Sequence, residues 1–258
     1  MKWHFFDTGE HTGRYNMDYD MQLASSVVQG EAYLRLYRWQ PYCISLGAHQ
    51  SESVINTEKC LQMGIDIVKR PTGGRAILHA EELTYSVVMH CSLEHTPQKI
   101  YAEINDALRL ALGLYNENLL RAELEHNQPD YGAIYKEGKG IACFAETAKN
   151  ELKYDHKKLI GSAQRKMGNV ILQHGSILCG KFHKRISGLL NISETEKIDM
   201  VRELQDKTIE IETILQTPVD YTRLKDAIKL GFSRFYEQDF ETGNPVDEQL
   251  IFTNGIHS

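Results

Sequence analysis

The chain has 258 residues, of which 41% are hydrophobic and 25% are charged, a composition typical of a soluble globular protein. Its formal net charge of −6 argues against general nucleic-acid binding. No apolar run approaches the roughly 20 residues that a membrane span needs, and Met1 to Asp7 lack an apolar signal segment. We therefore expect a cytoplasmic protein with one large domain, or a domain with a small appendage, that binds neither nucleic acid nor membrane.

The first third of the chain alternates between helical and strand patterns. Apolar residues that include Met21 and Val28 recur at helical spacing after Asn16, which is a plausible N-cap. Apolar and polar residues alternate in the segments that we predict as strands. In order, the predicted elements are a helix over 17–31, strands over 32–39 and 43–47, a helix over 57–63, and strands over 65–68 and 83–89.

The remainder of the chain predicts a second group of strands between helices. Pro97 opens a long helix, and both Ser187 and Ser193 offer helix starts. The predicted elements are a helix over 98–120, a mobile polar loop over 127–140, a short apolar segment over 142–145, strands over 151–154, 158–166 and 170–178, helices over 198–204, 208–215 and 221–236, and a loose tail after 243. This order predicts an α+β fold with a largely antiparallel mixed sheet covered by helices.

The stretch KRPTGGRAILH, residues 69–79, is the most informative in the sequence. Glycine has no Cβ, so the backbone at Gly73 and Gly74 can take positive φ and approach a ligand closely. Arg70 and Arg75 flank this turn with planar donors that suit a carboxylate or a phosphate. The alternative interpretation, a hairpin turn with two surface arginines, stays open on these residues alone, because Gly-Gly is a common turn dipeptide.

The five cysteines do not predict a disulfide framework or a metal site. Their number is odd and none forms a C-x-x-C pair, which is unlike structural zinc motifs. Most should be ordinary buried thiols. The five are Cys43, Cys60, Cys91, Cys143 and Cys179.

Four strings together resemble the lipoate-protein ligase A/octanoyltransferase family, which shares a catalytic domain with biotin protein ligases. They are KRPTGGRAILH followed by ELTYS, SLGAHQ at 45–50, KLIGSAQ at 158–164 and LQHGSIL at 172–178. The resemblance covers residues 1 to about 190. It implies the biotin/lipoate protein ligase-like fold, related to class II aminoacyl-tRNA synthetases, with 1–258 as a single catalytic domain and 191–258 as its helical C-terminal part.

The resemblance also implies a set of site residues. In this family the glycine turn covers the acyl chain, and the lysine of the K-x-x-G-S-A-Q string reaches the reacting carbonyl. Lys158 alone would be interpreted as an exposed surface lysine, and His174 could be a satisfied polar group beside the pocket. The implied substrate-binding residues are Arg70, Thr72, Gly73, Gly74, Arg75, Ala76, His79, Gly161, Ser162, Ala163, Gln164, His174 and Gly175, with Ile77, Leu78 and Val88 as candidate walls for an eight-carbon chain.

Cys143 is the candidate nucleophile. Ala142-Cys143-Phe144 is similar to the A-C-F string of one octanoyltransferase branch, in which the cysteine takes the acyl group. A nearby lysine ammonium would favour the thiolate, so Cys143 and Lys158 are the predicted catalytic pair. The alternative for Cys143 is a buried structural cysteine, which is the interpretation that we keep for the other four.

These residues suit a thioester exchange. A cysteine thiolate can accept an acyl group from acyl carrier protein, and an acceptor lysine can then take it as an amide. The first hypothesis is therefore an acyltransferase that moves octanoyl from acyl carrier protein to a lipoyl-accepting protein, such as the glycine cleavage H protein, without a cofactor. Nine Lys/Arg and two acidic residues between Lys149 and Arg185 predict a basic face that could steer acidic partners.

Three other hypotheses stay open. An ATP-dependent lipoate ligase is disfavoured because Arg75 stands where many ligases have a third glycine, Ala80-Glu81-Glu82 departs from their pattern, and the C-terminal part leaves little room for their accessory domain. A lipoyl or octanoyl amidotransferase would use the same cysteine chemistry. A non-catalytic module that binds acyl carrier protein would not need Cys143 and Lys158.

Overall fold

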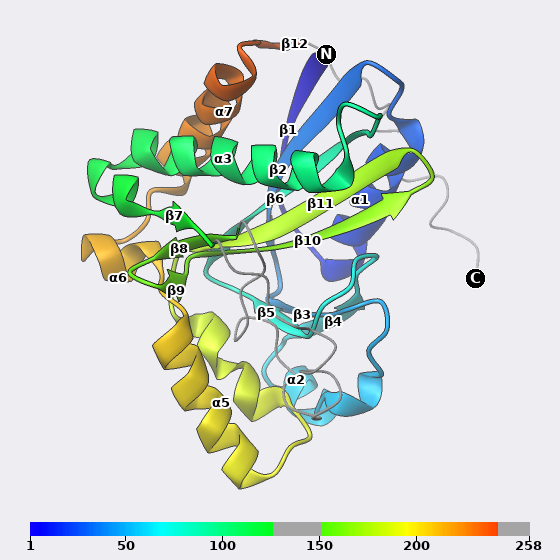
Figure 1. Cartoon of the computed structure of the whole chain (residues 1–258). Helices are drawn as coiled ribbons and strands as arrows, with labels where there is room; N and C mark the ends of the chain where they lie inside the picture. The colour runs from blue at the N-terminus through cyan, green and yellow to red at the C-terminus, as the bar shows by residue number, and fades with distance from the viewer. Residues whose placement is uncertain (126–150, 242–258) are drawn as a thin grey trace.

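The structure, a computed structural model, describes residues 1–125 and 151–241. Its main layer is a six-stranded mixed sheet in the order β10–β11–β6–β2–β1–β12 (Figure 1). Neighbouring strands from β10 to β2 are antiparallel, whereas β1 is parallel to both β2 and β12. The strands are β1 Lys2–His11, β2 Glu31–Trp39, β6 Glu82–His90, β10 Ile160–Met167, β11 Val170–Leu178 and β12 Phe240–Glu241.

Two small three-stranded sheets accompany the main sheet. The first has the order β4–β3–β5 and the second β7–β8–β9. In Figure 1 the first lies below the main sheet and the second lies at the end where β10 begins. Their strands are β3 Cys43–Leu46, β4 Asp66–Lys69, β5 Ile77–His79, β7 Glu123–Leu124, β8 Leu152–Tyr154 and β9 Lys157–Lys158.

Helices cover both faces of the main sheet. Helices α3 and α7 pack on one face and form the largest core with alternate residues of β2, β6 and β11. Helix α1 covers the opposite face, and α2 and α5 accompany the β4–β3–β5 sheet. The helices are α1 Gly13–Ser26, η1 Glu52–Val54, α2 Thr57–Gln62, α3 Pro97–Tyr115, η2 Glu117–Arg121, η4 Phe182–Leu189, α5 Glu194–Lys207, α6 Ile211–Leu215 and α7 Tyr221–Tyr236.

The α+β prediction is confirmed, and so are most of its elements. The bounds of α7 are those predicted, and Ser193 caps α5 through a capping box with Glu196. The apolar stripe of α3, which includes Ile100 and Ile104, is fully buried. Burial of each such side chain contributes about 1.5–3 kcal/mol, so the stripe fixes the helix on the sheet. The loop over 127–140, the segment over 142–145 and the tail lie outside the described residues.

The bounds of the first helix were predicted wrongly. Helix α1 begins after Thr12, whose hydroxyl accepts a hydrogen bond from the amide of Tyr15, and it ends at Ser26. Asn16 is not the cap, because its side chain is buried inside the helix and bonds to the chain elsewhere. Met21 and Val28 are exposed, so the apolar stripe of this helix is narrower than the spacing suggested.

Five other predictions are corrected. The turn over 70–76 is not a hairpin, because β4 and β5 both pair with β3, which lies between them. The strand over 158–166 changes sheets at Leu159, where β9 ends and β10 begins. Ser187 lies inside η4 and starts no helix. Helix α3 ends at Tyr115 rather than near 120, and α6 starts at Ile211 because the preceding residues bond along β9.

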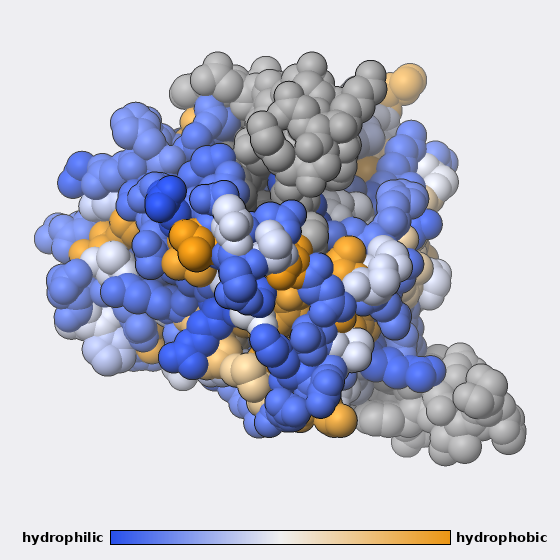
Figure 2. Space-filling model, turned by 90° about the horizontal axis from the view of Figure 1, so that it is seen from below, coloured by the Kyte–Doolittle hydropathy of each residue, from blue (hydrophilic) through white to orange (hydrophobic). Residues whose placement is uncertain are grey.

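The face that carries α2 and α5 is mainly hydrophilic, with apolar side chains in small separate groups (Figure 2). Leu61 on α2 and Ile198 on α5 are among the exposed apolar residues of the molecule. Single exposed apolar side chains are normal on globular proteins and need no partner. No helix within residues 1–125 and 151–241 combines the length and the apolarity needed to cross a bilayer.

The close approach of α3 and α7 gives a stability test. A Cβ on Gly231 would lie 2.5 Å from the Cβ and 2.9 Å from the amide nitrogen of Ala111, so the helices would have to separate. We expect Gly231→Ala to lower the free energy of unfolding by about 1–3 kcal/mol, measured by urea denaturation.

Gly113→Ala is the matched control. A Cβ there meets only the exposed side chain of Leu120, which can move. Because alanine favours a helix interior over glycine by roughly 0.5–1 kcal/mol, this variant should be neutral or more stable. Equal destabilisation of both variants would contradict the packing described here.

Candidate active site

A pocket lies between the main sheet and the β4–β3–β5 sheet, on the face of the main sheet opposite α3. Its empty volume is about 460 Å³, a figure that includes space open to solvent. Apolar surface predominates in its walls. The lining residues are Met17, Tyr37, Trp39, Ser45, Arg70, Ile77, His79, Thr84, Glu151, Lys158, Gly161, Ser162, Ala163, His174, Gly175 and Ser176.

Arg70 holds the glycine turn from the inside. Its guanidinium donates to the carbonyl oxygens of Ser45, Gly73 and Arg75 at 2.7–3.2 Å, and to Ser45 Oγ at 3.0 Å. Arg70 and Arg75 are 3% and 7% exposed, so the hypothesis of two surface arginines is wrong. The side chain of Arg70 also lines the pocket. A buried guanidinium with carbonyl partners gives the turn a fixed shape.

A second contact brings the turn against the β3 loop. A Cβ on Gly47 would lie 1.9 Å from the carbonyl oxygen of Gly74, so a side chain at Gly47 is excluded. Gly74 itself has φ +93°, a conformation that glycine adopts without strain. The amide of Ala48 donates to Thr72 O at 2.9 Å. Backbone contacts therefore fix the turn beside the pocket, between Arg70 and Ile77, which line it.

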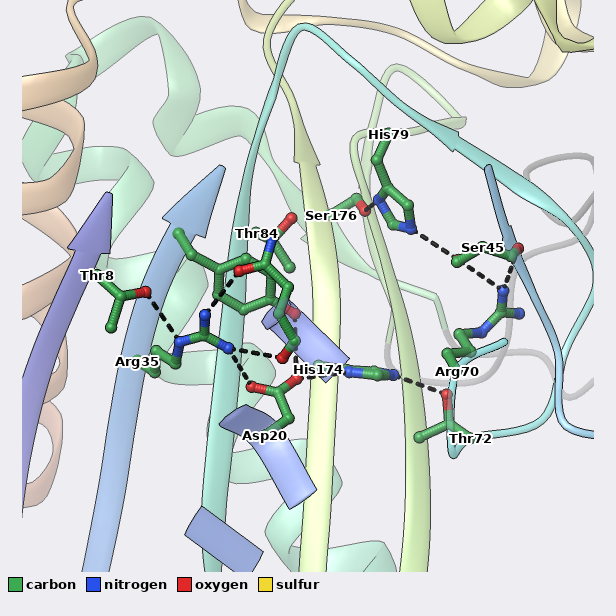
Figure 3. Close-up of polar contacts among 12 residues, drawn as sticks. Thr8, Asp20, Arg35, Ser45, Arg70, Thr72, His79, Thr84, His174 and Ser176 are labelled. Carbon is green, nitrogen blue, oxygen red and sulfur yellow. Dashed lines mark hydrogen bonds and ion pairs between the residues drawn. The ribbon is translucent and has the colours of Figure 1, made fainter. Parts of the chain in front are cut away.

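His174 connects the turn to the interior through a chain of hydrogen bonds (Figure 3). Its Nε2 lies 2.7 Å from Thr72 Oγ1, and its Nδ1 lies 3.1 Å from Asp20 Oδ2. Asp20 also accepts from Arg35 Nη1 at 2.8 Å and from the Tyr37 hydroxyl at 3.1 Å. With Asp20 ionised, His174 Nδ1 is the donor and Nε2 accepts from Thr72.

Burial sets the charges in this chain. Burial alone would raise the pKa of Asp20, but the hydrogen bond from His174 and the charge of Arg35 outweigh it and lower that pKa. Burial lowers the pKa of His174, which the nearby Asp20 carboxylate opposes only in part. His174 is therefore neutral at neutral pH, and its Nε2 accepts the hydrogen bond from Thr72.

A second histidine chain forms the opposite wall. His79 Nδ1 lies 2.7 Å from Glu82 Oε1, and His79 Nε2 lies 2.7 Å from Ser45 Oγ (Figure 3). The indole of Trp39 stacks on the His79 ring at 4.1 Å. Burial would raise the pKa of Glu82, but the charge of His79 and the hydrogen bonds to His79, Thr84 and Ser176 lower it. These contacts fix the ring of His79 at the pocket wall.

Lys158 is buried at the pocket, 2% exposed, where the sequence alone would suggest a surface lysine. Its Nζ lies 3.1 Å from Glu151 Oε2. Glu151 is equally buried, and its Oε1 accepts a hydrogen bond from the amide of Ser162 at 2.9 Å. Lys157, the neighbouring residue, points the other way and donates to Gln205 O.

Five more of the predicted residues line the pocket: Gly161, Ser162, Ala163, Gly175 and Ile77. Eight do not line it: Thr72, Gly73, Gly74, Arg75, Ala76, Gln164, Leu78 and Val88. Gln164 lies on the other face of β10 and bonds to Pro97 O and Gln173, whereas Leu78 and Val88 are buried in separate cores. Ala76 is likewise in the core beside the turn, and Gly73 is half-buried.

Four residues of the site escaped the sequence analysis: Asp20, Ser45, Glu82 and Glu151. Asp20, Ser45 and Glu151 lie in segments whose patterns predict an ordinary helix or strand, and Glu82 directly precedes such a strand. The partners of Asp20 and Ser45 are distant in the sequence, with His174 154 positions after Asp20 and His79 34 positions after Ser45. The one local signal for Glu151 is that it is an acidic residue close to Lys158 in the sequence.

The prediction that four of the cysteines are buried structural thiols is confirmed in part. Cys43, Cys60 and Cys179 are buried, and burial raises the pKa of each thiol, so they remain protonated. Cys91 is half-buried. Cys143 lies outside the described residues, so its role stays a prediction. In the described part of the chain, no three His, Cys, Asp or Glu side chains gather in a group that could hold a metal ion.

The fold is that of an acyl-ligase catalytic domain. A bipartite lipoate protein ligase from Thermoplasma acidophilum superposes with a TM-score of 0.74 at 19% identity, covering 96% of this chain and 89% of that one. Among curated proteins, octanoyltransferase LipM of Lysinibacillus sphaericus is 30% identical over 98% of this chain and 94% of its own. LipM of Exiguobacterium sp. is 32% identical over 97% and 90%.

The family model of the lipoyl protein ligase A/B catalytic domain matches residues 12–233. This chain belongs to that family. The resemblance predicted from the turn and the K-x-x-G-S-A-Q string is thereby confirmed.

The neutral state of buried His174 predicts a pH effect on stability. Because its folded pKa is lowered, the unfolded chain takes up a proton below about pH 6.5 that the folded chain refuses. Stability from this source is complete above that pH and is lost as the pH falls toward the folded pKa. His174→Gln should therefore flatten the slope of the free energy of unfolding between pH 7 and 5, by up to about 1.4 kcal/mol per pH unit. An unchanged slope in urea denaturation would mean that His174 takes up its proton equally in both states.

Proposed function

We propose that this chain is an octanoyl-[acyl-carrier-protein]:protein N-octanoyltransferase of lipoate biosynthesis. The observation that carries the proposal is the buried Lys158 side chain at one wall of a largely apolar pocket. An apolar slot accommodates an eight-carbon chain, and a fixed cation stabilises negative charge near its reacting end. The curated relatives are octanoyltransferases, which supports an acyltransferase over a binding module.

In the proposed reaction Cys143 is the nucleophile. Its thiolate attacks the carbonyl carbon of octanoyl-acyl carrier protein, and the carbonyl oxygen carries the negative charge of the tetrahedral intermediate. Collapse breaks the bond to the carrier sulfur, which leaves as a thiolate and takes up a proton. Lys158 stays cationic and stabilises both the attacking thiolate and the oxyanion.

The second half of the reaction transfers octanoyl to a lysine of the acceptor. The neutral acceptor amine attacks the Cys143 thioester, the C–S bond breaks, and an amide forms. We propose a lipoyl-domain protein as the acceptor, the glycine cleavage H protein in particular. A similar fold occurs in a lipoylation system that contains an E2 lipoyl domain, which supports an acceptor of this class.

The basic segment over 149–185 supplies fewer free charges than the sequence predicted. Lys158 is buried, Lys153 pairs with Glu125, and Lys184 pairs with Glu210. Lys166 and Lys181 are exposed on β10 and beside η4. We propose that such exposed cations steer acidic partner proteins, with an effect that salt weakens.

An ATP-dependent lipoate ligase remains the alternative. We propose that no ATP or other cofactor is required. The residues at 80–82, which depart from the ligase pattern, make contacts within the protein. Ala80 is buried, and Glu81 accepts a hydrogen bond from the amide of Phe182. The single-domain organisation, with residues 191–258 as a helical C-terminal part, and the cytoplasmic location stay predictions.

The decisive experiment mixes the purified protein with octanoyl-acyl carrier protein in the absence of ATP. Intact-protein mass spectrometry should show one octanoyl adduct that hydroxylamine removes, as it does a thioester, and peptide mapping should place it on Cys143. Addition of ATP should leave transfer to an acceptor lysine unchanged. An adduct that persists in Cys143→Ser, or strict dependence on ATP and free lipoate with release of AMP, would contradict the proposal.

Two neighbouring lysines provide a matched pair of variants. Lys158→Ala removes the pocket cation, so acyl-enzyme formation should fall by on the order of 10²–10³-fold, with kcat and kcat/KM lowered together. Lys157→Ala should keep most activity, because its side chain points toward α5 rather than the pocket. Single-turnover rates measure both. Equally mild losses would show that Lys158 does not act on the reacting groups.

A further inference from the structure

A lysine inside a thioester pocket creates a chemical problem. A neutral primary amine attacks a thioester and forms an amide, which is the reaction proposed for the acceptor. If Lys158 were neutral while a thioester carbonyl lay in the pocket, it would itself take the octanoyl group. The enzyme would then inactivate itself, because an amide is not reversed by thiols.

The geometry around Lys158 contains a means of preventing this. Glu151 Oε2 lies 3.1 Å from Lys158 Nζ, and both side chains are buried to within a few per cent. The other oxygen, Glu151 Oε1, accepts the amide hydrogen of Ser162 at 2.9 Å. A carboxylate held by the backbone of β10 has a fixed position, so it lies beside the ammonium before any substrate arrives.

We propose that Glu151 is a positioning residue that keeps Lys158 protonated, so that the pocket lysine stabilises charge but cannot accept the acyl group. The inference rests on the proposed function, since it assumes that a thioester enters this pocket. By this inference, Glu151 determines which of two amines accepts the octanoyl group: the acceptor lysine does, and Lys158 does not.

The electrostatics of the pocket favour this role. Burial removes water from an ammonium and favours the neutral amine, unless a nearby negative charge compensates. Among the described residues that line the pocket, Glu151 is the one carboxylate, whereas Arg70 adds a further positive charge. His79 and His174 also face the pocket, and each has a carboxylate behind it, Glu82 or Asp20.

A neighbouring cation outside the pocket disfavours a charged Lys158, so the charge of Glu151 has a repulsion to overcome. Lys153 on β8 is close enough to Lys158 for the two charges to repel each other. Lys153 has an ion pair of its own with Glu125 on the far side of the β7–β8 pairing. Repulsion from Lys153 disfavours a charged Lys158, and the Glu151 carboxylate opposes it at hydrogen-bonding distance.

Loss of this control would produce a defined side reaction. The nitrogen lone pair of neutral Lys158 attacks the thioester carbonyl carbon, an amide C–N bond forms, and the C–S bond breaks. The electron pair of that bond leaves with sulfur, and the proton released by the amine ends on the thiolate. The products are N-octanoyl-Lys158 and a free thiol, with no change of oxidation state.

The test uses Glu151→Gln and a small thioester, S-octanoyl-N-acetylcysteamine, which needs no carrier protein to enter the pocket. Glutamine keeps an oxygen for the amide of Ser162 and removes the charge. After treatment with hydroxylamine, which cleaves thioesters and spares amides, peptide mapping should find octanoyl on Lys158. The rate of this labelling should be at least 10-fold higher in Glu151→Gln than in the wild type at pH 7, and its onset should move to lower pH.

Glu125→Gln is the matched control. It removes the carboxylate of the neighbouring Glu–Lys pair outside the pocket, so Lys158 should be labelled no faster than in the wild type. The double variant Glu151→Gln/Lys158→Arg should lose the stable label, because a guanidinium stays charged. Circular dichroism and urea denaturation establish that each variant is folded.

Each outcome is informative. No stable label in folded Glu151→Gln, equal labelling of variant and wild type, or faster labelling of Lys158 in Glu125→Gln than in the wild type would overturn the inference. A wild type that forms the hydroxylamine-sensitive adduct on Cys143, together with an unlabelled Lys158 in Glu151→Gln, would refute the role of Glu151 and leave the transferase intact. Strict ATP dependence would instead refute the transferase, whatever the state of Lys158.

Discussion

The buried ion pair between Arg35 and Asp20 is the interaction on which the pocket depends. Both side chains are fully inaccessible, and removing two charges from water costs several kcal/mol per ion unless every donor is satisfied. Here the guanidinium also donates to Thr8 Oγ1 and to both oxygens of Asn16, and it lies between the rings of Tyr19 and Tyr37. The pair therefore fixes α1 on the main sheet in one position.

The consequences of that position reach the pocket through hydrogen bonds. Asp20 holds His174 on β11, and His174 holds Thr72 in the glycine turn (Figure 3). Arg70 then fixes the rest of the turn against β3. Because each group has one available orientation, the wall of the pocket is set before a ligand binds. Such preorganisation reduces the free-energy cost of ordering a site during binding.

The sequence predicted the elements better than their connections. The strand over 170–178 and the helix over 221–236 were predictable because their local patterns agree with their burial. The local patterns assigned no role to Arg35 or Asp20, because their pairing joins two segments that are 15 residues apart and fold onto each other. The glycine turn and Lys158 were recognisable by resemblance alone, since a local pattern favours a surface turn and a surface lysine.

The segment after α5 explains why Lys158 can be held so firmly in a two-residue strand. The amide of Ile209 donates to Lys158 O at 3.0 Å, and Thr208 forms a bridge with Lys158 on the side of β9 away from β8. Lys158 thus has backbone partners on both sides, while Glu151 holds its side chain. Residues 208–209 lie beyond residue 190, where the sequence shows little resemblance to the motifs of the family. They hold Lys158 through backbone groups, which do not depend on the type of side chain. A structural role of this kind therefore leaves no pattern in the sequence.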